Sequence, residues 1–443
     1  MQLITLKNGT QLKFDPVSVK FFQMDGTPIT VRNDINADQD CSKVSNQLNM
    51  HMHANTRFDN PKNLRIVLGH ACNFKCKYCS QSHSPLDLPP AKQVSKFMMD
   101  LFKTTNLSQL KVIQFWGGEP LLYWPTICFF MDAFREINPN IGFSIVTNGS
   151  LITKRMGDVI LNDDQFGFIL SHDGPGQHLR GIDPLALGSR TRDILLQLAK
   201  EKVPNQHRKY LNEGRNFAVN PVITSAVGSL TSLVEWYDKA FEGCEVPIAE
   251  SIPVIPIQDD TAQYALHHDD LPKYTAMIYH DLLKLGLHRF DNYKMLYDLF
   301  LQKWSLPQFL VNPKKALCFT TDPYMLTLDL NGNILPCQTF AASDHLGNGE
   351  PASYSNLLDF GDKTDPTTTG PDIKMPTVHG YGSRGSKCSN CPVVSFCMGG
   401  CPYLVGAQHD IDCRVKYHHF LGLLFTFVTM AFGEKVLKIE TLD

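Results

Sequence analysis

Short apolar runs alternate with segments of helical periodicity from Leu64 to Leu301, and this alternation constrains the fold more than any other feature of the sequence. It is typical of repeated βα units around a parallel sheet, whose functional residues gather at the C-terminal ends of the strands. We therefore predict an α/β fold. The expected strands are Leu64–Leu68, Val112–Phe115, Phe143–Thr147, Phe166–Ser171, Phe217–Thr224 and Ile252–Ile257. The expected helices include Val94–Phe102, Cys128–Phe134, Arg192–Leu198 and Leu230–Phe241, where apolar residues recur every three or four positions.

Three regions differ in their sequence pattern. Residues 1–63 contain two hairpin patterns, LKNGTQLKF and FFQMDGTPITV, followed by a polar stretch. Residues 64–305 carry the βα alternation, and residues 306–443 replace it with loops rich in Pro, Gly, Thr and Cys. We expect a short N-terminal β extension, an α/β core and a small cysteine-rich domain. The apolar run Phe420–Phe432 near the end is expected to form a buried helix.

The composition excludes several classes of partner. The 443 residues are 43% hydrophobic, which suffices for a large core, and the formal net charge is only −3. Such a balance provides no broad electrostatic footprint for nucleic acid or an anionic membrane, so we expect neither partner. The chain opens MQLITLKNGTQLKFD without a secretory signal, and Phe420–Phe432 is shorter than the roughly 20 residues of a membrane span. We expect a cytoplasmic protein.

The thirteen cysteines fall into two groups and three isolated positions. A large chain without a signal peptide lies in a reducing compartment, so clustered cysteines indicate metal binding rather than a disulfide scaffold. One group is Cys72, Cys76 and Cys79, and the other lies in the last third of the chain: Cys318, Cys337, Cys388, Cys391, Cys397, Cys401 and Cys413. Cys41, Cys128 and Cys244 stand alone and are interpreted as small apolar residues or idle thiols.

The first group follows the expected strand Leu64–Leu68 in the segment HACNFKCKYCSQ. Three thiolates leave one iron of a [4Fe–4S] cluster open to a small molecule, because such a cluster needs four ligands. This CxxxCxxC spacing, with Tyr78 before the last cysteine, resembles the signature of the radical S-adenosylmethionine (SAM) superfamily. The resemblance implies a partial (β/α)6 TIM-like barrel in which Cys72, Cys76 and Cys79 hold a cluster and SAM binds the open iron. It also implies that SAM is cleaved to a 5′-deoxyadenosyl radical, which abstracts a substrate hydrogen.

Three further motifs follow expected strands. The segment FWGGEP ends in Gly117–Pro120 and resembles the GGEP motif of the same superfamily, in which glycines allow close backbone approach and a carboxylate can accept from an ammonium group. The segments TNGS (Thr147–Ser150) and SHDGPG (Ser171–Gly176) are similar to its TNG and SxDGP loops. By this resemblance the SAM-binding residues are Tyr78, Gly117, Gly118, Glu119, Asn148 and Ser171, with Arg190 or Arg192 as the partner of the SAM carboxylate.

The second cysteine group resembles the seven-cysteine SPASM domain of radical SAM maturases, although CxxC pairs also suit a zinc ribbon. The resemblance assigns Cys388, Cys391, Cys397 and Cys413 to an outer auxiliary cluster. It assigns Cys318, Cys337 and Cys401 to an inner one. Some family members have an eighth cysteine shortly after the first, but here FTTDPYML follows Cys318. Asp322, Asp329, water or the substrate are the alternatives for the fourth ligand of the inner cluster.

Taken together, the resemblance implies SAM and three [4Fe–4S] clusters as cofactors. The preferred function is oxidative modification of a ribosomally made precursor peptide, with a side-chain crosslink such as a cyclophane or an ether as the product. A reductant such as flavodoxin or ferredoxin is the expected second partner. One alternative is oxidation of Ser or Cys to formylglycine, as in anaerobic sulfatase maturation. An alternative from another class is a non-enzymatic iron–sulfur carrier, against which the intact GGEP and SxDG segments count.

Overall fold

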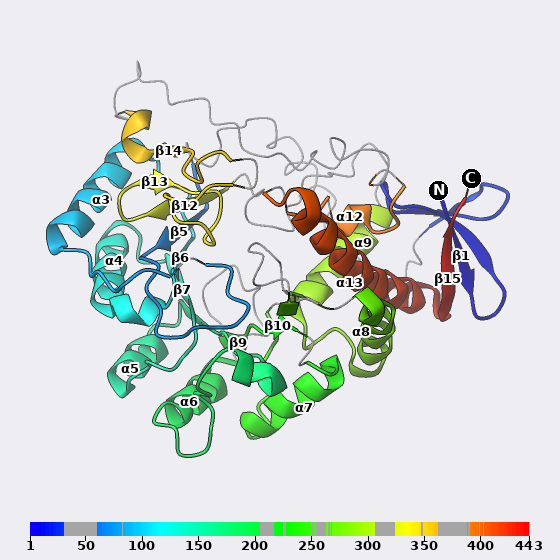
Figure 1. Ribbon diagram of the computed structural model, residues 1–443, viewed down its shortest axis with the longest axis horizontal. Coiled ribbons are helices and arrows are strands. Elements are labelled where there is room, and N and C mark those ends of the chain that lie inside the picture. Colours follow the sequence, from blue (N-terminus) through cyan, green and yellow to red (C-terminus); the bar gives the residue numbers. More distant parts are fainter. Residues whose placement is uncertain are drawn as a thin grey trace.

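A computed structural model describes most of the chain, and Figure 1 shows it as a ribbon. The described residues are 1–30, 60–81, 83–203, 217–224, 227–249, 252–253, 263–264, 266, 268–305, 324–346, 349–361, 388, 390–397, 399–401 and 403–442. Cys41, Cys318 and Asp322 lie outside these residues. Within them, an α/β core carries an eight-stranded sheet in the order β14-β13-β12-β5-β6-β7-β8-β9.

Five of the predicted strands form the parallel centre of this sheet. They are β5 (Asn63–Val67), β6 (Val112–Trp116), β7 (Gly142–Thr147), β8 (Phe166–Leu170) and β9 (Phe217–Val219), each parallel to the next. The predicted strand Phe217–Thr224 is divided, because its second part forms β10 (Val222–Ile223). That part pairs in parallel with β11 (Ile252–Pro253), the described start of the sixth predicted strand, in a separate two-stranded sheet. The parallel α/β prediction is confirmed.

Helices cover one face of the sheet, and Figure 1 shows α3 to α6 following its outer side. Phe115 on β6 stacks with Phe143 on β7 and with Phe130 on the helix that follows β6. Side chains alternate between the two faces of a strand, so these aromatic residues share the helix-covered face. The helices are α3 (Ala91–Thr104), α4 (Trp124–Ile137), α5 (Lys154–Asn162), α6 (Arg192–Lys202), α7 (Leu230–Ala240), α8 (Leu271–Leu285) and α9 (Asp291–Ser305). Short 3-10 helices are η1 (Pro120–Tyr123), η2 (Gly174–Leu179), η6 (His268–Asp270) and η9 (Leu357–Phe360).

The opposite face of the sheet carries a polar row. Three register neighbours form this row: Arg65 on β5, Gln114 on β6 and Ser144 on β7. Each stands next to an apolar residue in its strand, so its side chain lies on the opposite face from the stacked aromatic rings. The Arg65 guanidinium donates to Gln114 Oε1 from Nη2 at 2.5 Å and from Nε at 3.1 Å, and it also donates to Gln338. Arg65 and Ser144 in this row are buried and Gln114 is half-buried, so other parts of the chain cover that face.

A strand that sequence analysis did not predict extends the sheet beyond β5. It is β12 (Met325–Asp329), which lies parallel to β5 with Met325 opposite Asn63 and Asp329 opposite Val67. Antiparallel β13 (Asn333–Ile334) and β14 (Ser355–Asn356) follow it at the edge. These three strands belong to residues 306–443, the region in which we expect the cysteine-rich domain, and they continue the core sheet. The free edge of β5 supplies the unpaired backbone groups that β12 satisfies.

The two ends of the chain form a second sheet together. Both predicted N-terminal hairpins are present, as β1 (Gln2–Leu6) with β2 (Gln11–Asp15) and β3 (Lys20–Phe22) with β4 (Pro28–Ile29). The last strand, β15 (Val436–Thr441), was not predicted, and it pairs antiparallel with β1. Figure 1 shows the N- and C-termini side by side on this sheet.

The predicted buried helix is part of α13 (Gly406–Phe432), which follows the short α12 (Val394–Cys397) and packs against α8. Its buried residues include Leu423, Leu424 and Phe427. Among the described residues, none of the helices combines the length and the apolar character that crossing a membrane requires. The prediction of a buried helix is therefore confirmed.

Candidate radical-generating site and auxiliary cysteines

Cys72, Cys76 and Cys79 lie together in the loop that follows β5, and all three are half-buried free thiols. The Cys79 amide donates to the Cys76 carbonyl at 3.1 Å, which closes the loop. Burial raises the pKa of Cys72 to about 11 and that of Cys76 to about 12, and the thiols also raise one another's pKa. Such thiols stay protonated at neutral pH until a metal displaces the proton.

The glycines of the GGEP segment pack directly on this cysteine loop. The Gly118 amide donates to Gly69 O at 3.0 Å, and the Glu119 amide donates to Ala71 O at 2.9 Å. A Cβ on Gly118 would lie 2.3 Å from Ala71 O, and one on Gly117, whose φ is +149°, would lie 2.3 Å from Gly69 O. In this structure, the two glycines therefore bring two loops together at backbone distance, which no other residue type allows.

Glu119 connects the ends of β6 and β7. Its side chain is 1% exposed, and Oε1 accepts from Thr147 Oγ1 at 2.6 Å and from the Leu121 amide at 2.9 Å. Oε2 accepts from the Asn148 amide at 2.8 Å. Burial raises the pKa of Glu119, while these hydrogen bonds oppose the rise. A carboxylate oxygen has two lone pairs, so Oε2 retains room for one further donor.

Asn148 joins the TNGS loop to the cysteine loop. Its Nδ2 donates to Asn73 Oδ1 at 2.9 Å, and Asn73 Nδ2 donates to Ser150 Oγ at 2.8 Å. The Asn148 Oδ1 atom accepts from both the amide and the hydroxyl of Ser150. The structure thus brings together three of the motifs that were predicted to act as one site. Asn73 and Ser150 were not singled out from the sequence, although both belong to those motifs.

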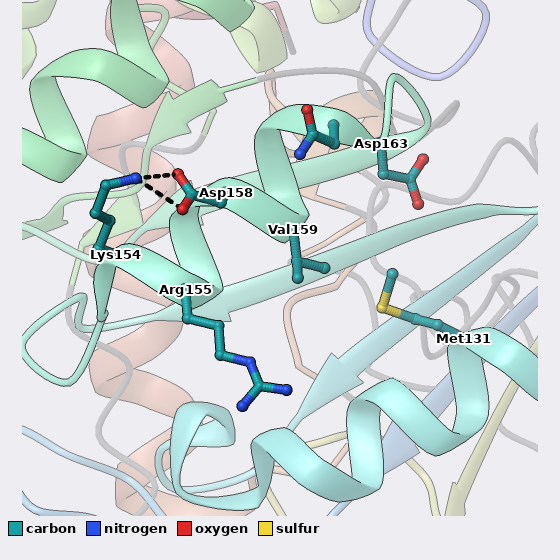
Figure 2. Close-up of a pocket in the computed structure, with 7 residues that line it drawn as sticks. Met131, Lys154, Arg155, Asp158, Val159 and Asp163 are labelled. Carbon is teal, nitrogen blue, oxygen red and sulfur yellow. Dashed lines mark hydrogen bonds and ion pairs between the residues drawn. The ribbon is translucent and has the colours of Figure 1, made fainter.

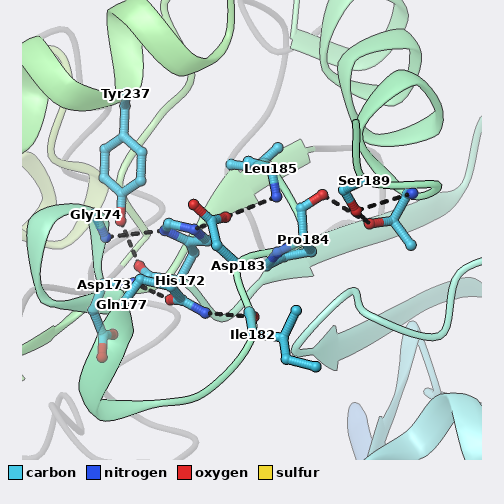
Figure 3. A network of polar contacts seen from close by, with 11 residues as sticks. His172, Asp173, Gly174, Gln177, Ile182, Asp183, Pro184, Leu185, Ser189 and Tyr237 are labelled. Carbon is cyan, nitrogen blue, oxygen red and sulfur yellow. Dashed lines mark hydrogen bonds and ion pairs between the residues drawn. The ribbon is translucent and has the colours of Figure 1, made fainter. Parts of the chain in front are cut away.

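The SHDGPG segment contributes buried polar residues after β8. Ser171 lies at the strand end, and its amide donates to Thr147 O at 2.7 Å. His172 is fully buried, stacks on Trp236 at 4.6 Å, and pairs its Nε2 with Asp183 at 3.0 Å. Burial lowers the pKa of His172. Figure 3 shows that this network runs from Tyr237 through His172 toward Asp183 and Ser189.

Asp173 faces the cysteine loop instead. It accepts from the Tyr78 hydroxyl, and its Oδ1 accepts from Arg180 Nη2 at 2.9 Å and from the Val222 amide at 2.9 Å. Arg180 also lies over the Tyr78 ring, 5.6 Å from its centroid. Tyr78 is therefore fixed by a buried ion pair.

The two arginines predicted as SAM carboxylate partners lie apart from this ion pair. Arg192, at the start of α6, pairs with Glu242 Oε1 at 3.1 Å, and Arg190 is exposed in the preceding loop. The cation that lies against the cysteine loop is Arg180, which sequence analysis missed. Its position seven residues after Asp173, at the end of a 3-10 helix, carries no signal in sequence spacing alone.

The C-terminal cysteines assigned to an outer cluster lie near one another. Burial raises the pKa of Cys391, and the charges of Cys413 and Cys388 raise it further. Burial raises the pKa of Cys397 to about 12, with further contributions from Asp412, Cys413 and Cys391. The loop that carries Cys401 is held by Asp412, whose Oδ2 accepts from the Cys401 amide at 3.3 Å and pairs with Lys416 at 2.9 Å.

Cys337 and Cys401, two of the cysteines assigned to an inner cluster, pack against one apolar group that includes Phe340 and Tyr403. The third, Cys318, lies outside the described residues, as does Asp322. Asp329 ends β12, and its carboxylate accepts from the Asn331 and Asn333 amides and from Asn333 Nδ2. These bonds shape the β12–β13 turn, so Asp329 already has a structural role.

Three thiols on one loop are a donor set that suits an iron–sulfur cluster. Among the described side chains, no group of three or more His, Cys, Asp or Glu converges on one ion position. A cubane cluster binds its thiolates at separate corners, so the ligands stand farther apart than those of one ion. The three thiols of the Cys72 loop are close enough to interact electrostatically, and the buried Nε of Arg180 beside them has no partner in the described structure. Both observations fit a bound cluster there.

Residues 66–178, from β5 to the SHDGPG segment, match the family model described as the radical SAM superfamily. They form a radical SAM domain. Domains of this superfamily bind SAM and a [4Fe–4S] cluster. The radical SAM prediction is confirmed, and the matched residues contain the three cysteines, the GGEP segment, the TNGS segment and Tyr78.

Curated relatives are similar to this radical SAM domain. The radical SAM cyclopropyl synthase TigE of Paramaledivibacter caminithermalis is 31% identical over 156 residues, which make up 30% of this chain and 32% of TigE. The GTP 3′,8-cyclase of Aliarcobacter butzleri is 32% identical over 94 residues, which make up 20% of this chain and 28% of the cyclase. The chain thus spans about a third or less of the length of these relatives.

Solved structures share the fold over a larger part of the chain. Streptococcus suis SuiB bound to the precursor peptide SuiA aligns with a TM-score of 0.51 and 18% identity, covering 84% of this chain and 78% of SuiB. Native anSMEcpe with bound AdoMet aligns with a TM-score of 0.58 and 17% identity, covering 84% of this chain and 99% of that one. At these identities the likeness establishes the fold.

A surface hollow of about 650 Å³ lies away from the cysteine loop of the radical SAM domain. Figure 2 shows it between α4 and α5, with Met131, Arg155 and Val159 in its walls. Lys154 and Asp158 close one side through an ion pair at 2.8 Å. Because α4 and α5 cover the outer face of the sheet, this hollow lies on the side opposite the polar row and is no candidate for the radical chemistry.

Proposed function

We propose that the chain is a radical SAM enzyme that oxidatively modifies a peptide, with side-chain crosslinking of a ribosomally made precursor as the reaction. The observation that carries this proposal is the joining of the GGEP and TNGS segments and Asp173 onto one three-cysteine loop. A carrier protein needs no such arrangement around an incompletely ligated cluster. The proposal therefore favours an enzyme over an iron–sulfur scaffold.

Cys72, Cys76 and Cys79 would hold the cluster, and SAM would bind beside Gly117, Gly118, Glu119, Asn148 and Ser171. When bound, the reduced cluster and SAM supply reductive cleavage of the sulfonium and hence a carbon-centred radical. Glu119 keeps its buried carboxylate fixed through three donors, so the remaining acceptor position on Oε2 has a defined direction. A fixed carboxylate in a water-poor site binds an ammonium group strongly.

The C-terminal cysteines support two auxiliary clusters, which with the first gives three [4Fe–4S] clusters. Cys388, Cys391, Cys397 and Cys413 would complete the outer one, and the inner one would use Cys318, Cys337 and Cys401. A crosslink removes two hydrogen atoms from the peptide, so the second electron needs an acceptor after the radical has taken the first hydrogen. Auxiliary clusters fit that role, and a flavodoxin or ferredoxin would supply the reducing electron.

A peptide substrate is supported by neighbours that were solved with peptides, namely SuiB with its precursor and anSMEcpe with the Cp18Cys peptide. Crosslinking is preferred to formylglycine formation because the N-terminal strands and β15 build a sheet outside the core, which offers an edge for a leader peptide to join. Formylglycine formation remains the second candidate, because anSMEcpe is covered over 99% of its length.

Iron analysis tests the proposal directly. Anaerobically reconstituted full-length protein should bind about twelve irons, the sum of three cubane clusters. Replacing Cys72, Cys76 and Cys79 together by Ala should remove about four irons and abolish cleavage of SAM. Replacing the isolated Cys128 by Ala is the matched control and should change neither quantity. Zinc instead of iron in the anaerobic preparation, or SAM cleavage by the triple variant, would overturn the proposal.

The crosslinking step has a separate test. Any short reading frame that sequencing finds beside the gene is co-expressed with this chain, and the resulting peptide is analysed by tandem mass spectrometry. A crosslinked peptide loses two hydrogens and resists fragmentation between the joined residues. A peptide that gains an aldehyde, detected with a hydrazide reagent, would instead support the formylglycine alternative.

A further inference from the structure

A short segment after η2 packs tightly on the cysteine loop. The Lys77 amide donates to Leu179 O at 2.9 Å, which joins the two segments through their backbones. Gly181, with φ at +150°, lies beneath the Phe74 ring, and a Cβ there would come within 3.3 Å of it. Arg180 is the residue between these two contacts. The contacts of its two neighbours therefore fix the Arg180 backbone next to the cysteine loop.

The Arg180 side chain is only 10% exposed and is held from two directions. Its Nη2 donates to Asp173, which is 1% exposed and also accepts from the Tyr78 hydroxyl. Its guanidinium faces the Tyr78 ring at 5.6 Å. Burial acts to lower the pKa of Arg180, but Asp173 and Tyr78 outweigh it and raise that pKa, so the group stays cationic.

One donor of this cation is both buried and unpartnered. The Nε atom of Arg180 is buried without a hydrogen-bond partner in the described structure. A buried N–H of a charged group without a partner is costly, and of the two described arginines with such an Nε, Arg135 and Arg180, only Arg180 packs on the cysteine loop. The leftover donor belongs to a side chain that lies over the Tyr78 ring and whose neighbours in the chain pack on Phe74 and Lys77 of the cysteine loop.

We propose that Arg180 is a positioning residue for the cluster on the Cys72 loop, to which its Nε–H donates and whose reduced form its charge stabilises. This inference rests on the proposed function. Hydrogen bonds to cluster sulfurs and nearby positive charge both raise a cluster's reduction potential, because reduction adds negative charge. Asp173 and Tyr78 fix the guanidinium, so the donor is aimed before the cluster binds.

The chain contains a matched control for this arrangement. Arg135 on α4 pairs with Asp163 at 2.7 Å, lies over the Phe143 ring at 4.9 Å, and also has a buried Nε without a partner in the described structure. It has the same three features as Arg180, but it lies on the helix-covered face of the sheet. Arg135→Gln therefore reports the general cost of losing such a cation.

The test is a redox titration of full-length Arg180→Gln, Arg180→Lys and Arg135→Gln, followed by electron paramagnetic resonance. The signal of the cluster on the Cys72 loop is obtained as a difference spectrum. The spectrum of the same protein with Cys72, Cys76 and Cys79 replaced by Ala is subtracted from that of each protein. Arg180→Gln should keep its iron and disfavour the reduced cluster by about tenfold, or about 59 mV for one electron. Arg180→Lys keeps the charge but loses the planar guanidinium with its fixed donors. Its reduction potential should therefore lie between those of Arg180→Gln and the wild type. Arg135→Gln should not move the potential.

Two results would overturn the inference. One is an unchanged potential in Arg180→Gln with full iron, which would leave the residue without influence on the cluster. The other is loss of about four irons in both Arg180 variants, which would make Arg180 a structural clamp only. A wild-type protein without a difference signal would instead refute the proposed function, so the two failures are distinguishable.

Discussion

Thr147 Oγ1 donates a 2.6 Å hydrogen bond to Glu119 Oε1, and this contact fastens the end of β7 to the loop after β6. With the Asn148 and Leu121 amides, it gives the buried carboxylate three donors inside the protein. Glu119 therefore has two tasks that can be separated by experiment. It holds two loops together, and in the proposed function it binds the ammonium group of SAM.

Glu119→Ala should weaken SAM binding about tenfold or more, because a hydrogen bond to a charged group contributes roughly 1.5–3 kcal/mol. It should also lower the free energy of unfolding by roughly 1–3 kcal/mol, since buried donors lose their acceptor. Equilibrium dialysis with labelled SAM and urea unfolding measure the two effects. Glu119→Gln keeps an acceptor oxygen, so it should recover stability more than SAM affinity. Wild-type affinity in a folded Glu119→Ala protein would refute the assignment.

Gly118→Ala should displace the cysteine loop. Its Cβ would lie 2.3 Å from the backbone oxygen of Ala71, and a backbone atom cannot move without its loop. We expect about four irons fewer after reconstitution and no cleavage of SAM. Gly228→Ala is the control, because its Cβ would meet only Ser232 Oγ at 4.0 Å. Full iron content in Gly118→Ala would show that the close packing of the two loops is dispensable.

Asp291, at the start of α9, should make the free energy of unfolding depend on pH. Burial raises its pKa from 3.8 to about 6, so the folded protein binds this proton more tightly than the unfolded chain does. Stability should therefore fall as the pH rises from about 4 to 6, by up to about 3 kcal/mol in total. Asp291→Asn should remove this loss and raise the free energy of unfolding at pH 7.

The measurement is urea unfolding of both proteins between pH 5 and pH 7.5. The stabilisation by Asp291→Asn should be larger at pH 7 than at pH 5. Asp298→Asn is the control on the same helix, because Asp298 forms an ion pair with Lys294 near the surface. If Asp291→Asn has the same effect at both pH values, its carboxyl group does not have the raised pKa described here.

The pair formed by Asp412 and Lys416 should couple α13 to the loop that carries Cys401. Asp412→Asn removes the counter-charge of the Lys416 ammonium, whose side chain is 22% exposed, so the cost should lie below the about 3–5 kcal/mol of a fully buried pair. We expect a lower melting temperature and loss of iron from the C-terminal cysteines. The double variant Asp412→Asn with Lys416→Met should recover most of the stability, because it removes both charges.

Asp410→Asn is the control for this prediction, since Asp410 is exposed on the same helix. Calorimetry of the wild type, Asp412→Asn, Lys416→Met and the double variant gives the coupling between Asp412 and Lys416. Strict additivity of the two single substitutions would contradict the pairing.

The sequence by itself determined the parallel strands of the core and the motifs that make up the radical SAM domain. Strands β5 to β9 were visible because a parallel sheet buried on both faces needs continuous apolar runs, and the helices because covering a sheet needs apolar residues at helical spacing. The cysteine spacing was visible because cluster ligands from one loop must be close in the chain. The N-terminal hairpins were visible because turn residues such as Asn8 and Gly9 stand between two apolar strands.

Only the tertiary structure decided which distant residues meet. Strand β12 joins β5 across about 260 residues of sequence, and β15 joins β1 from the other end of the chain. Both are short segments whose strand state depends on a free sheet edge, and a sheet edge is created only when the rest of the fold forms. The position of Arg180 beside the cysteine loop is also set only by the tertiary structure. Its spacing from the cysteines carries no information, and its role follows from the packing that buries it against Asp173 and Tyr78.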